Sequence, residues 1–425
     1  MQKIGDLVRA LKRDSPFLIV VANFMAMALA LATAPVVARA IGPEGRGESA
    51  ATLAAFAIVP IFLAIGIPLE IRRLAAQGTA DPAIRASRDL WFIAVIPATA
   101  TAWALDFMVF QSLAPPARLL AFIGVVSAPL TMSWTCDVSV LIAQARYRAV
   151  MLLRLTQPVI FFVGAFSIWM LGNLSVTVIL AINIVATAVT ATLGASFVRV
   201  SLRGKRESHR SMIQNGFRYS GSSIAEAASN RLDQIIVLPL IGAGAAGMYS
   251  VAVTIGALPL ALGHALGATY FRAVAAASRH EIDQLISTGI RAISSLAAVG
   301  CGILALASPL LISILFGPSF TDAIIPALIT IVGSFALTVG YVCSMMLAAQ
   351  GQGLRMTIAQ VVALAVGIFL LLALTPSLGA IGASVASSCS YLVVLAILLL
   401  GLRANVFSLV PTPSGVRTAM RELFR

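Results

Sequence analysis

Long apolar segments alternate with short polar ones along the whole chain of 425 residues. About 20 apolar residues suffice to cross the hydrocarbon core of a bilayer as an α-helix. Backbone N–H and C=O groups in lipid must be satisfied within such a segment, so each one is expected to be helical. The pattern predicts an all-α, polytopic membrane protein with about twelve transmembrane helices, placed near residues 16–40, 48–69, 89–111, 118–142, 150–171, 174–198, 217–241, 247–271, 289–315, 322–349, 356–375 and 378–402.

The composition agrees with a membrane environment. Hydrophobic residues make up 60% of the chain and charged residues 11%, whereas soluble domains carry about 25% charged residues. The net charge of +13 does not indicate nucleic-acid binding, because the basic residues lie in short connections between apolar segments and form no single patch with aromatic residues.

The positions of the basic residues predict the orientation of the chain. With the N-terminus inside, 25 of the 29 Lys and Arg residues fall in the two tails, in the inner connections or at the inner ends of the adjoining spans. Cytoplasmic segments of membrane proteins carry such an excess of Lys and Arg. We therefore expect an even number of spans with the N- and C-termini in the cytoplasm.

The longest inner connection divides the twelve spans into two groups of six. We interpret residues 1–199 as an N-terminal six-helix lobe and residues 200–216 as a basic cytoplasmic linker. Residues 217–402 then form a C-terminal six-helix lobe, and residues 403–425 form a basic cytoplasmic tail.

A short motif suggests that the two halves are structural repeats. Ile41-Gly42, at the end of the first span, recurs 200 residues later as Ile241-Gly242, at the end of the seventh span. Six spans per half make such repeats parallel, related by an axis along the membrane normal. Chance similarity between glycine-rich turns is the alternative interpretation.

Ionisable side chains within the spans are candidate functional groups, since each costs about 2.5–3.5 kcal/mol at the centre of a helix on insertion scales. The seventh span holds the clearest group, in which Arg231 falls near mid-depth. Residues two apart on a helix do not face each other, so Arg231 needs a partner other than Asp233, or a water-filled space. This group consists of Glu226, Asn230, Arg231 and Asp233.

Other spans carry isolated polar residues. Arg39 lies near the outer end of the first span and Asp137 in the inner half of the fourth. For these two, a structural interhelical contact and a functional role are about equally compatible with the sequence. A structural hydrogen bond or salt bridge is the preferred interpretation of Asp106, Asn23 and His264, and Tyr341 adds milder polarity.

The sequence carries no motif of a catalytic, cofactor or metal site. Its four cysteines are scattered without paired spacing, and three scattered histidines make no case for structural zinc. A Walker A loop, a GxSxG elbow and an HExxH motif are all absent. We expect no catalytic residues, no metal and no cofactor, so uphill transport would draw on an ion gradient, the membrane potential or substrate supply.

Five motifs, taken in their order and spacing, resemble those of a known family. They are Asn-Arg-Leu-Asp at 230–233, Gly-x-Tyr-Ser-x-Ala at 247–252, Leu-Phe-Gly-Pro-Ser-Phe at 315–320, Ala-Gln-Gly-Gln at 349–352 and Leu-Gly-Ala-Ile-Gly-Ala-Ser at 378–384. Together they resemble the O-antigen-type oligosaccharide flippases of the MOP superfamily, in its MATE-like polysaccharide transporter branch. The resemblance covers nearly the whole chain.

The resemblance implies a function. It implies two lobes around a central cavity in the bacterial plasma (inner) membrane. By alternating access they would move a polyprenyl-pyrophosphate-linked oligosaccharide to the outer leaflet, for the biosynthesis of cell-surface polysaccharides such as lipopolysaccharide. Arg231 could meet the pyrophosphate through charge-assisted hydrogen bonds. The implied substrate-binding residues are Arg231, Asn230 and Arg39, and those for coupling to H⁺ or Na⁺, or for charge pairing, are Asp233, Glu226 and Asp137.

Two other functions remain open. A cation-coupled multidrug exporter of the same superfamily is the nearer alternative, whereas lipid II flippases differ in having fourteen spans. A membrane-embedded polysaccharide polymerase or ligase would need catalytic groups at a membrane face, commonly on a long outer loop. The predicted outer connections are only a few residues each, which favours transport.

Overall fold

The computed structural model describes residues 14–201 and 203–424, without the side chains of 219, 220, 222, 223, 279, 423 and 424. Within these ranges the chain is helical and contains no strand. Of the basic residues assigned above to the cytoplasmic tails, Lys3, Arg9, Lys12, Arg13 and Arg425 lie outside the described residues.

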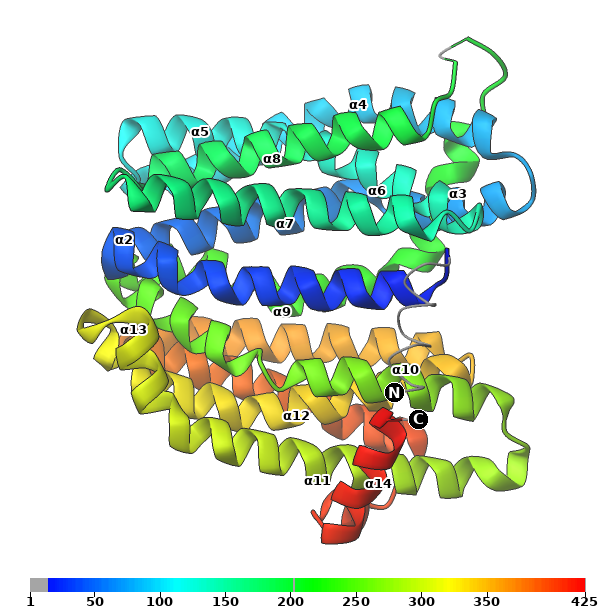
Figure 1. The fold of residues 1–425 in the computed structure, drawn as a ribbon, viewed down its shortest axis with the longest axis vertical. Coiled ribbons are helices and arrows are strands. Elements are labelled where there is room, and N and C mark those ends of the chain that lie inside the picture. Colours follow the sequence, from blue (N-terminus) through cyan, green and yellow to red (C-terminus); the bar gives the residue numbers. More distant parts are fainter. Residues whose placement is uncertain (1–13, 202, 425) are drawn as a thin grey trace, which may run out of the picture. The chain divides into compact units, whose positions relative to one another are not determined.

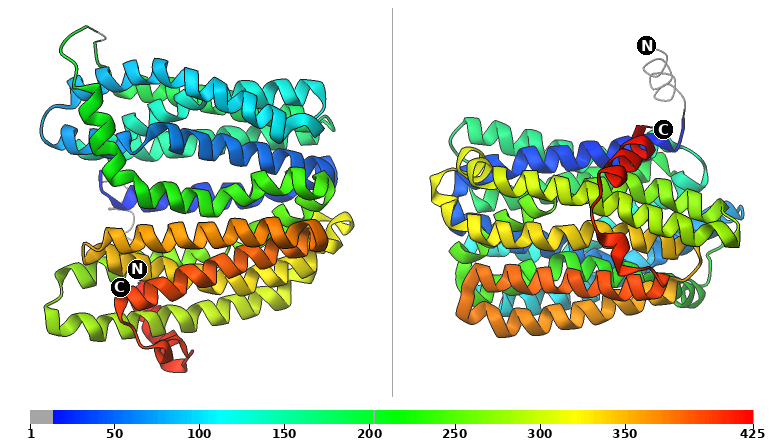
Figure 2. Two further views of the ribbon diagram at one scale, coloured as in Figure 1. Left: turned by 180° about the vertical axis from the view of Figure 1, so that it is seen from behind. Right: turned by 90° about the horizontal axis from the view of Figure 1, so that it is seen from below.

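The chain forms two compact units, of which the first ends at Ile224 and the second begins at Ala225. Within each unit the long helices run side by side (Figures 1 and 2). The first unit contains α2 (Phe17–Ala64), α3 (Ile67–Ala76), α4 (Ala80–Met108), η1 (Phe110–Ser112), α5 (Pro115–Val126), α6 (Ala128–Ala143), α7 (Tyr147–Met170), α8 (Val176–Phe197) and the start of α9 (His209–Gly256).

The second unit begins within α9. It continues with α10 (Leu260–Ala276), α11 (Arg279–Leu311), η2 (Ile312–Phe316), η3 (Pro318–Ala323), α12 (Ile324–Ala349), α13 (Gly353–Leu402), η4 (Val406–Leu409) and α14 (Pro413–Phe424). Because α9 starts at His209, the second half of the segment expected as a linker is helical. The residue boundaries of the two lobes stay a prediction.

The helices account for twelve membrane-crossing segments. In the described part of the chain, eight helices are long and apolar enough to cross a membrane, and the bent pair α5–α6 makes a ninth span. Three of the eight contain one non-helical residue, Gly42, Gly242 or Gly379. A straight helix of 48 residues, the length of α2, would be about 72 Å long, more than twice the hydrocarbon thickness of about 30 Å. Dividing these three helices at their glycines gives twelve spans, which confirms the prediction.

Gly42 and Gly242 adopt the same backbone conformation. Their φ/ψ angles are 67°/−174° and 79°/170°, a region open almost only to glycine. Each glycine bends the chain between the first and second long segments of its half. The recurring Ile-Gly pair therefore has a physical reason, because no other residue makes this bend without strain.

One expected connection lies elsewhere. The sequence placed the join between the last two spans at 375–377, but the helix continues through Pro376 and bends at Gly379 (φ 58°). Proline has a φ compatible with a helix, and only glycine readily takes the positive φ of the bend. The bend is sharp, since a Cβ on Gly382 would collide with the Leu374 carbonyl.

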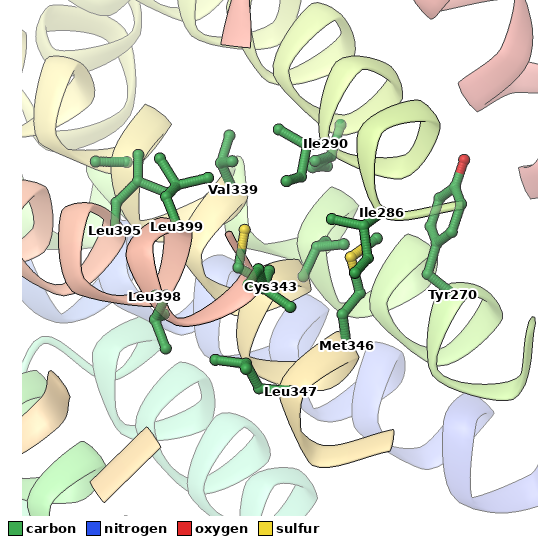
Figure 3. Packing of buried hydrophobic residues seen from close by; sticks show 14 of the residues in the cluster. Tyr270, Ile286, Ile290, Val339, Cys343, Met346, Leu347, Leu395, Leu398 and Leu399 are labelled. Carbon is green, nitrogen blue, oxygen red and sulfur yellow. The ribbon is translucent and has the colours of Figure 1, made fainter. Parts of the chain in front are cut away.

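Buried residues of α10 to α13 form the core of the second unit. Figure 3 shows side chains from α11, such as Ile286 and Ile290, packed with Cys343 and Met346 of α12 and Leu398 of α13. In lipid, close packing and interhelical hydrogen bonds hold helices together more than the hydrophobic effect does.

Small residues bring the helices of the second unit into close contact. A Cβ on Gly333 of α12 would collide with Ser388 of α13. The Ser388 hydroxyl donates to the Ile329 carbonyl at 3.0 Å, and the Ser334 hydroxyl donates to the Gly256 carbonyl at 2.5 Å. These contacts fix α9 and α13 against α12 and so position the polar residues described next.

Candidate functional site

Asp233 of α9 is the centre of a buried polar cluster in the second unit. The Tyr249 hydroxyl donates a hydrogen bond to Oδ2 of Asp233. The Ser387 hydroxyl donates to the same oxygen at 3.2 Å, and the Gln234 amide donates to Oδ1 at 2.8 Å. Tyr249 is only 1% exposed and Ser387 7%. The carboxylate therefore has three donors, all from the protein.

Two glycine bends create this cluster. Asp233 and Tyr249 belong to the same helix and would lie about 24 Å apart if it were straight. The bend at Gly242 turns the second part of α9 back so that the two side chains meet. Ser387 reaches the same carboxylate from the part of α13 that follows the bend at Gly379.

A small cavity adjoins the Asp233 carboxylate. Its volume of about 20 Å³ is enough for one water molecule. Ser229, which also lines it, has a buried hydroxyl without a hydrogen-bond partner, so the cavity has polar groups able to bind a water-sized species. The lining residues are Ala228, Ser229, Leu232, Asp233, Leu364, Gly367, Ile368, Leu371, Ser387 and Ser390.

Arg231 lies two residues from Asp233 but does not share its contacts. Its side chain is exposed and forms no hydrogen bond or ion pair with any residue that the structure describes. It interacts with the Asp233 carboxylate only through longer-range electrostatics. The guanidinium is thus available to an external anion.

Glu226 lies about two turns before Asp233 on α9, and Asn230 about one turn before it. The Glu226 side chain is exposed and that of Asn230 is half-buried. Neither forms a side-chain hydrogen bond within residues 14–201 and 203–424. Glu226, Asn230 and Arg231 are therefore three neighbouring polar groups whose hydrogen-bonding capacity is unused.

The other two predicted site residues lie in the first unit. Arg39 is exposed on α2. Asp137 of α6 is 1% exposed, and its Oδ2 has no hydrogen-bond partner among the described residues. That oxygen packs on Gly194 of α8, where a Cβ would lie 2.8 Å from it. Asp137 and Arg39 thus belong to a different unit from the cluster around Asp233.

Two polar residues have the structural partners expected of them. The Arg118 guanidinium binds both carboxylate oxygens of Asp106, at 2.6 and 2.7 Å. Arg154 donates to the Asn23 side chain at 2.6 Å. The structural interpretation of Asp106 and Asn23 is confirmed.

Sequence reasoning missed Tyr249 and Ser387 as partners of Asp233. In the sequence, Tyr249 stands out only as part of the motif at 247–252. Ser387 lies in a serine-rich stretch of α13 whose members Ser384, Ser387 and Ser388 are all buried. Serines at a spacing of three or four in an apolar helix mark a polar face, and that pattern was the available signal.

No arrangement of metal ligands occurs among the described residues, since no group of three or more His, Cys, Asp or Glu side chains could hold an ion. All four cysteines are free. The polar groups of the second unit can bind an anion, accept protons or bind hydroxyl groups.

Known structures share this fold. The lipid II flippase MurJ in its inward closed conformation is similar with a TM-score of 0.75 and 13% identity, over 96% of this chain and 92% of that one. A multidrug resistance MATE family transporter of the MOP superfamily, in an inward-facing conformation, is similar with a TM-score of 0.68 and 16% identity, over 93% and 96%. At these identities the likeness establishes the fold.

A third similar structure is a MOP superfamily transporter from Pyrococcus furiosus, whose binding pocket is described as having reversed polarity. Its TM-score is 0.58 at 15% identity, over 93% of this chain and 95% of that one. No curated protein matches the sequence significantly.

A sequence family matches more than half of the chain. The model of the family described as "Polysaccharide biosynthesis protein" matches residues 13–271. This match agrees with the resemblance noted from the motifs, and the structural matches agree with the superfamily. The chain therefore belongs to the polysaccharide biosynthesis protein family and has the fold of the MOP superfamily transporters.

Proposed function

We propose that this protein flips a polyprenyl-pyrophosphate-linked oligosaccharide from the cytoplasmic to the outer leaflet by alternating access, for cell-surface polysaccharide biosynthesis. The O-antigen of lipopolysaccharide is one product of this class. The protein acts in the bacterial inner membrane with both termini in the cytoplasm. The family and the fold indicate a transporter rather than a catalyst.

The observation that carries this proposal is that the Arg231 side chain is exposed and forms no hydrogen bond or ion pair with the described residues. The neighbouring Asp233 carboxylate is occupied by Tyr249 and Ser387, so the guanidinium lacks a bonded counter-ion in the described chain. An unpaired cation at this depth in a membrane span is costly unless it faces water or a ligand. A pyrophosphate offers the planar fork of arginine two or more charge-assisted hydrogen bonds.

The other candidate residues have supporting roles in this proposal. Asn230 donates to the substrate beside Arg231, and Arg39 contacts it at the outer end of the first span. Asp233, Glu226 and Asp137 are candidates for coupling to H⁺ or Na⁺ or for charge pairing. The cavity beside Asp233 supports a coupling role there, because it is lined by Asp233 and Ser229 and has room for a single water-sized species.

A cation-coupled multidrug exporter is the second candidate. The exposed Glu226 on the same helix favours it, since a carboxylate without a partner suits a cationic drug. The family match favours the oligosaccharide. A polysaccharide polymerase or ligase is the third candidate, and no observation in the described chain favours it.

Deletion of the gene in its own organism distinguishes these functions. We expect lipid-linked oligosaccharide to accumulate on the cytoplasmic side of the membrane and surface polysaccharide to disappear, while drug sensitivity is unchanged. A deletion strain that keeps its surface polysaccharide but becomes sensitive to cationic drugs contradicts the flippase. Accumulation of short lipid-linked units on the outer leaflet indicates a polymerase or ligase.

A further inference from the structure

Two aromatic rings stack on each other in the second unit, away from the Asp233 cluster. The ring centroids of His264 in α10 and Tyr341 in α12 lie 4.3 Å apart, with 26° between the ring planes. Tyr341 is half-buried and is held closely by α10, because a Cβ on Gly267 would lie 2.9 Å from its Cε1 atom. Tyr341 is thus held in place and supports the His264 ring by stacking.

His264 is the exposed member of this stack. It has no hydrogen-bond partner in the described part of the chain. Its ring is held by the stack below it, so the aromatic face is already in place before a ligand binds. A flat ligand can pack on such a face with little loss of side-chain entropy.

Polar groups of α9 lie beside the stack. The Glu226 carboxylate is close enough for its charge to act on the Tyr341 hydroxyl. Asn230 follows Glu226 by four residues and shares its helix face. Neither side chain has a partner within the described ranges, as noted above, so the carboxylate and amide can both bind a ligand.

These residues lie within membrane-crossing segments. Glu226 and His264 belong to the segment Ile224–Ala276, and Tyr341 lies inside α12 (Ile324–Ala349). Exposed carboxylate and imidazole groups within such segments face water or a ligand rather than lipid tails. The stack and its polar neighbours therefore lie on a hydrated surface.

We propose that the His264–Tyr341 stack, with Glu226 and Asn230 beside it, binds a sugar ring of the substrate. One face of a pyranose carries C–H groups that pack on an aromatic ring, and its edge carries hydroxyl groups. Glu226 accepts hydrogen bonds from those hydroxyls, and Asn230 both accepts and donates. Binding sites commonly combine aromatic walls with a few such polar groups.

The spacing along α9 agrees with a glycosylated pyrophosphate. Arg231 follows Glu226 by five residues, a rise of about 8 Å along the helix and a rotation of about 140° around it. A first sugar and the adjacent pyrophosphate extend over a similar length. This inference rests on the proposed function for the identity of the ligand, and adds the part of the site that recognises the glycan.

Binding of two ligands to the purified full-length protein tests the inference. One ligand is the lipid-linked oligosaccharide extracted from cells that lack the transporter, and the other is bare polyprenyl pyrophosphate. We expect His264→Ala to weaken binding of the glycosylated ligand about tenfold or more, equivalent to 1.4 kcal/mol, and to leave bare carrier unaffected. His264→Phe keeps an aromatic face, so its affinity should stay within about threefold of the wild type.

Further variants complete the test. Glu226→Ala should weaken only the glycosylated ligand, whereas Arg231→Ala should weaken both. His280→Ala, which changes an exposed histidine on α11, is the matched control and should change neither. A His264→Phe protein as defective as His264→Ala would instead show that the imidazole acts by binding protons, and would overturn the sugar-binding role.

Two outcomes separate this inference from the proposed function. If the wild-type protein binds both ligands equally, the sugar subsite is wrong and the flippase function stands. If it binds neither ligand, both proposals are wrong.

Discussion

The Tyr249 hydroxyl donates its hydrogen bond to the carboxylate of Asp233, sixteen residues earlier in the same helix. The bend at Gly242 brings the two side chains together. Since this bond and that of Ser387 occupy Asp233, the nearby Arg231 is left to bind a ligand. The ligand-binding role proposed for Arg231 therefore depends on the hydrogen bonds that Tyr249 and Ser387 donate to Asp233.

Removing the Tyr249 hydroxyl tests this relationship. Tyr249→Phe leaves the half-buried Asp233 carboxylate with one donor fewer, and we expect it to lower the free energy of unfolding by about 1–3 kcal/mol. Thermal denaturation of the detergent-solubilised protein measures the change. Tyr391→Phe is the control, because Tyr391 is also buried but its hydroxyl has no hydrogen bond to the described residues, so its loss should change stability little. Equal stability of wild type and Tyr249→Phe would show that the bond contributes nothing.

Arg231 should be needed for transport and not for stability. Arg231→Ala removes no bonded partner, so we expect normal membrane levels together with failed export and accumulation of lipid-linked precursor. Arg231→Lys should restore export only in part, since an ammonium group cannot reproduce the bidentate fork. Arg272→Ala, an exposed arginine of α10, is the control. Full export by Arg231→Ala, or its failure through loss of the protein, contradicts the assignment.

Asp137 should tolerate loss of its charge. Its Oδ2 has no hydrogen-bond partner in the part of the chain described, so the isosteric Asp137→Asn removes no bond to that oxygen and relieves the cost of a buried carboxylate. We expect the melting temperature to stay equal or to rise. Gly194→Ala should lower it, because the new Cβ would lie 2.8 Å from Oδ2. A clear loss of stability in Asp137→Asn would reveal a structural role for the charge.

Glu70 of α3, outside the membrane-spanning helices, should make stability depend on pH. Its buried carboxylate accepts hydrogen bonds from Arg73 at 2.6 and 2.8 Å and from Asn215 at 3.0 Å. The hydrogen bond from Arg73, and then that from Asn215, lower the Glu70 pKa against the raising effect of burial.

The lowered pKa of Glu70 determines how stability changes with pH. The folded protein binds the proton of Glu70 more weakly than the unfolded chain, whose glutamates have a pKa of about 4.3. The contribution to stability is complete above that value and is lost as the pH falls through the lower, folded pKa. Glu70→Gln should remove this part of the acid dependence, as measured by melting temperature against pH. An unchanged pH profile in Glu70→Gln would contradict the prediction.

The number of spans and the polar residues of α9 could be predicted from sequence, because they depend only on the order of apolar and polar residues. The partners of Asp233 could not. They depend on which helix faces meet after the chain bends at Gly242 and Gly379, and hydropathy does not contain that information. The same limit explains the misplaced last connection, since Pro376 fits within the helix and the bend occurs at Gly379.

Transport of the lipid-linked oligosaccharide by the purified protein tests the central claim most directly. Proteoliposomes would carry the labelled substrate in both leaflets, and an impermeant reagent that destroys only outward-facing label would be added. With wild-type protein we expect the label to become almost fully accessible within minutes, whereas vesicles with Arg231→Ala should keep the half that is protected in empty vesicles. Protection that stays at one half with active, correctly folded wild-type protein would contradict the claim that this chain is a flippase.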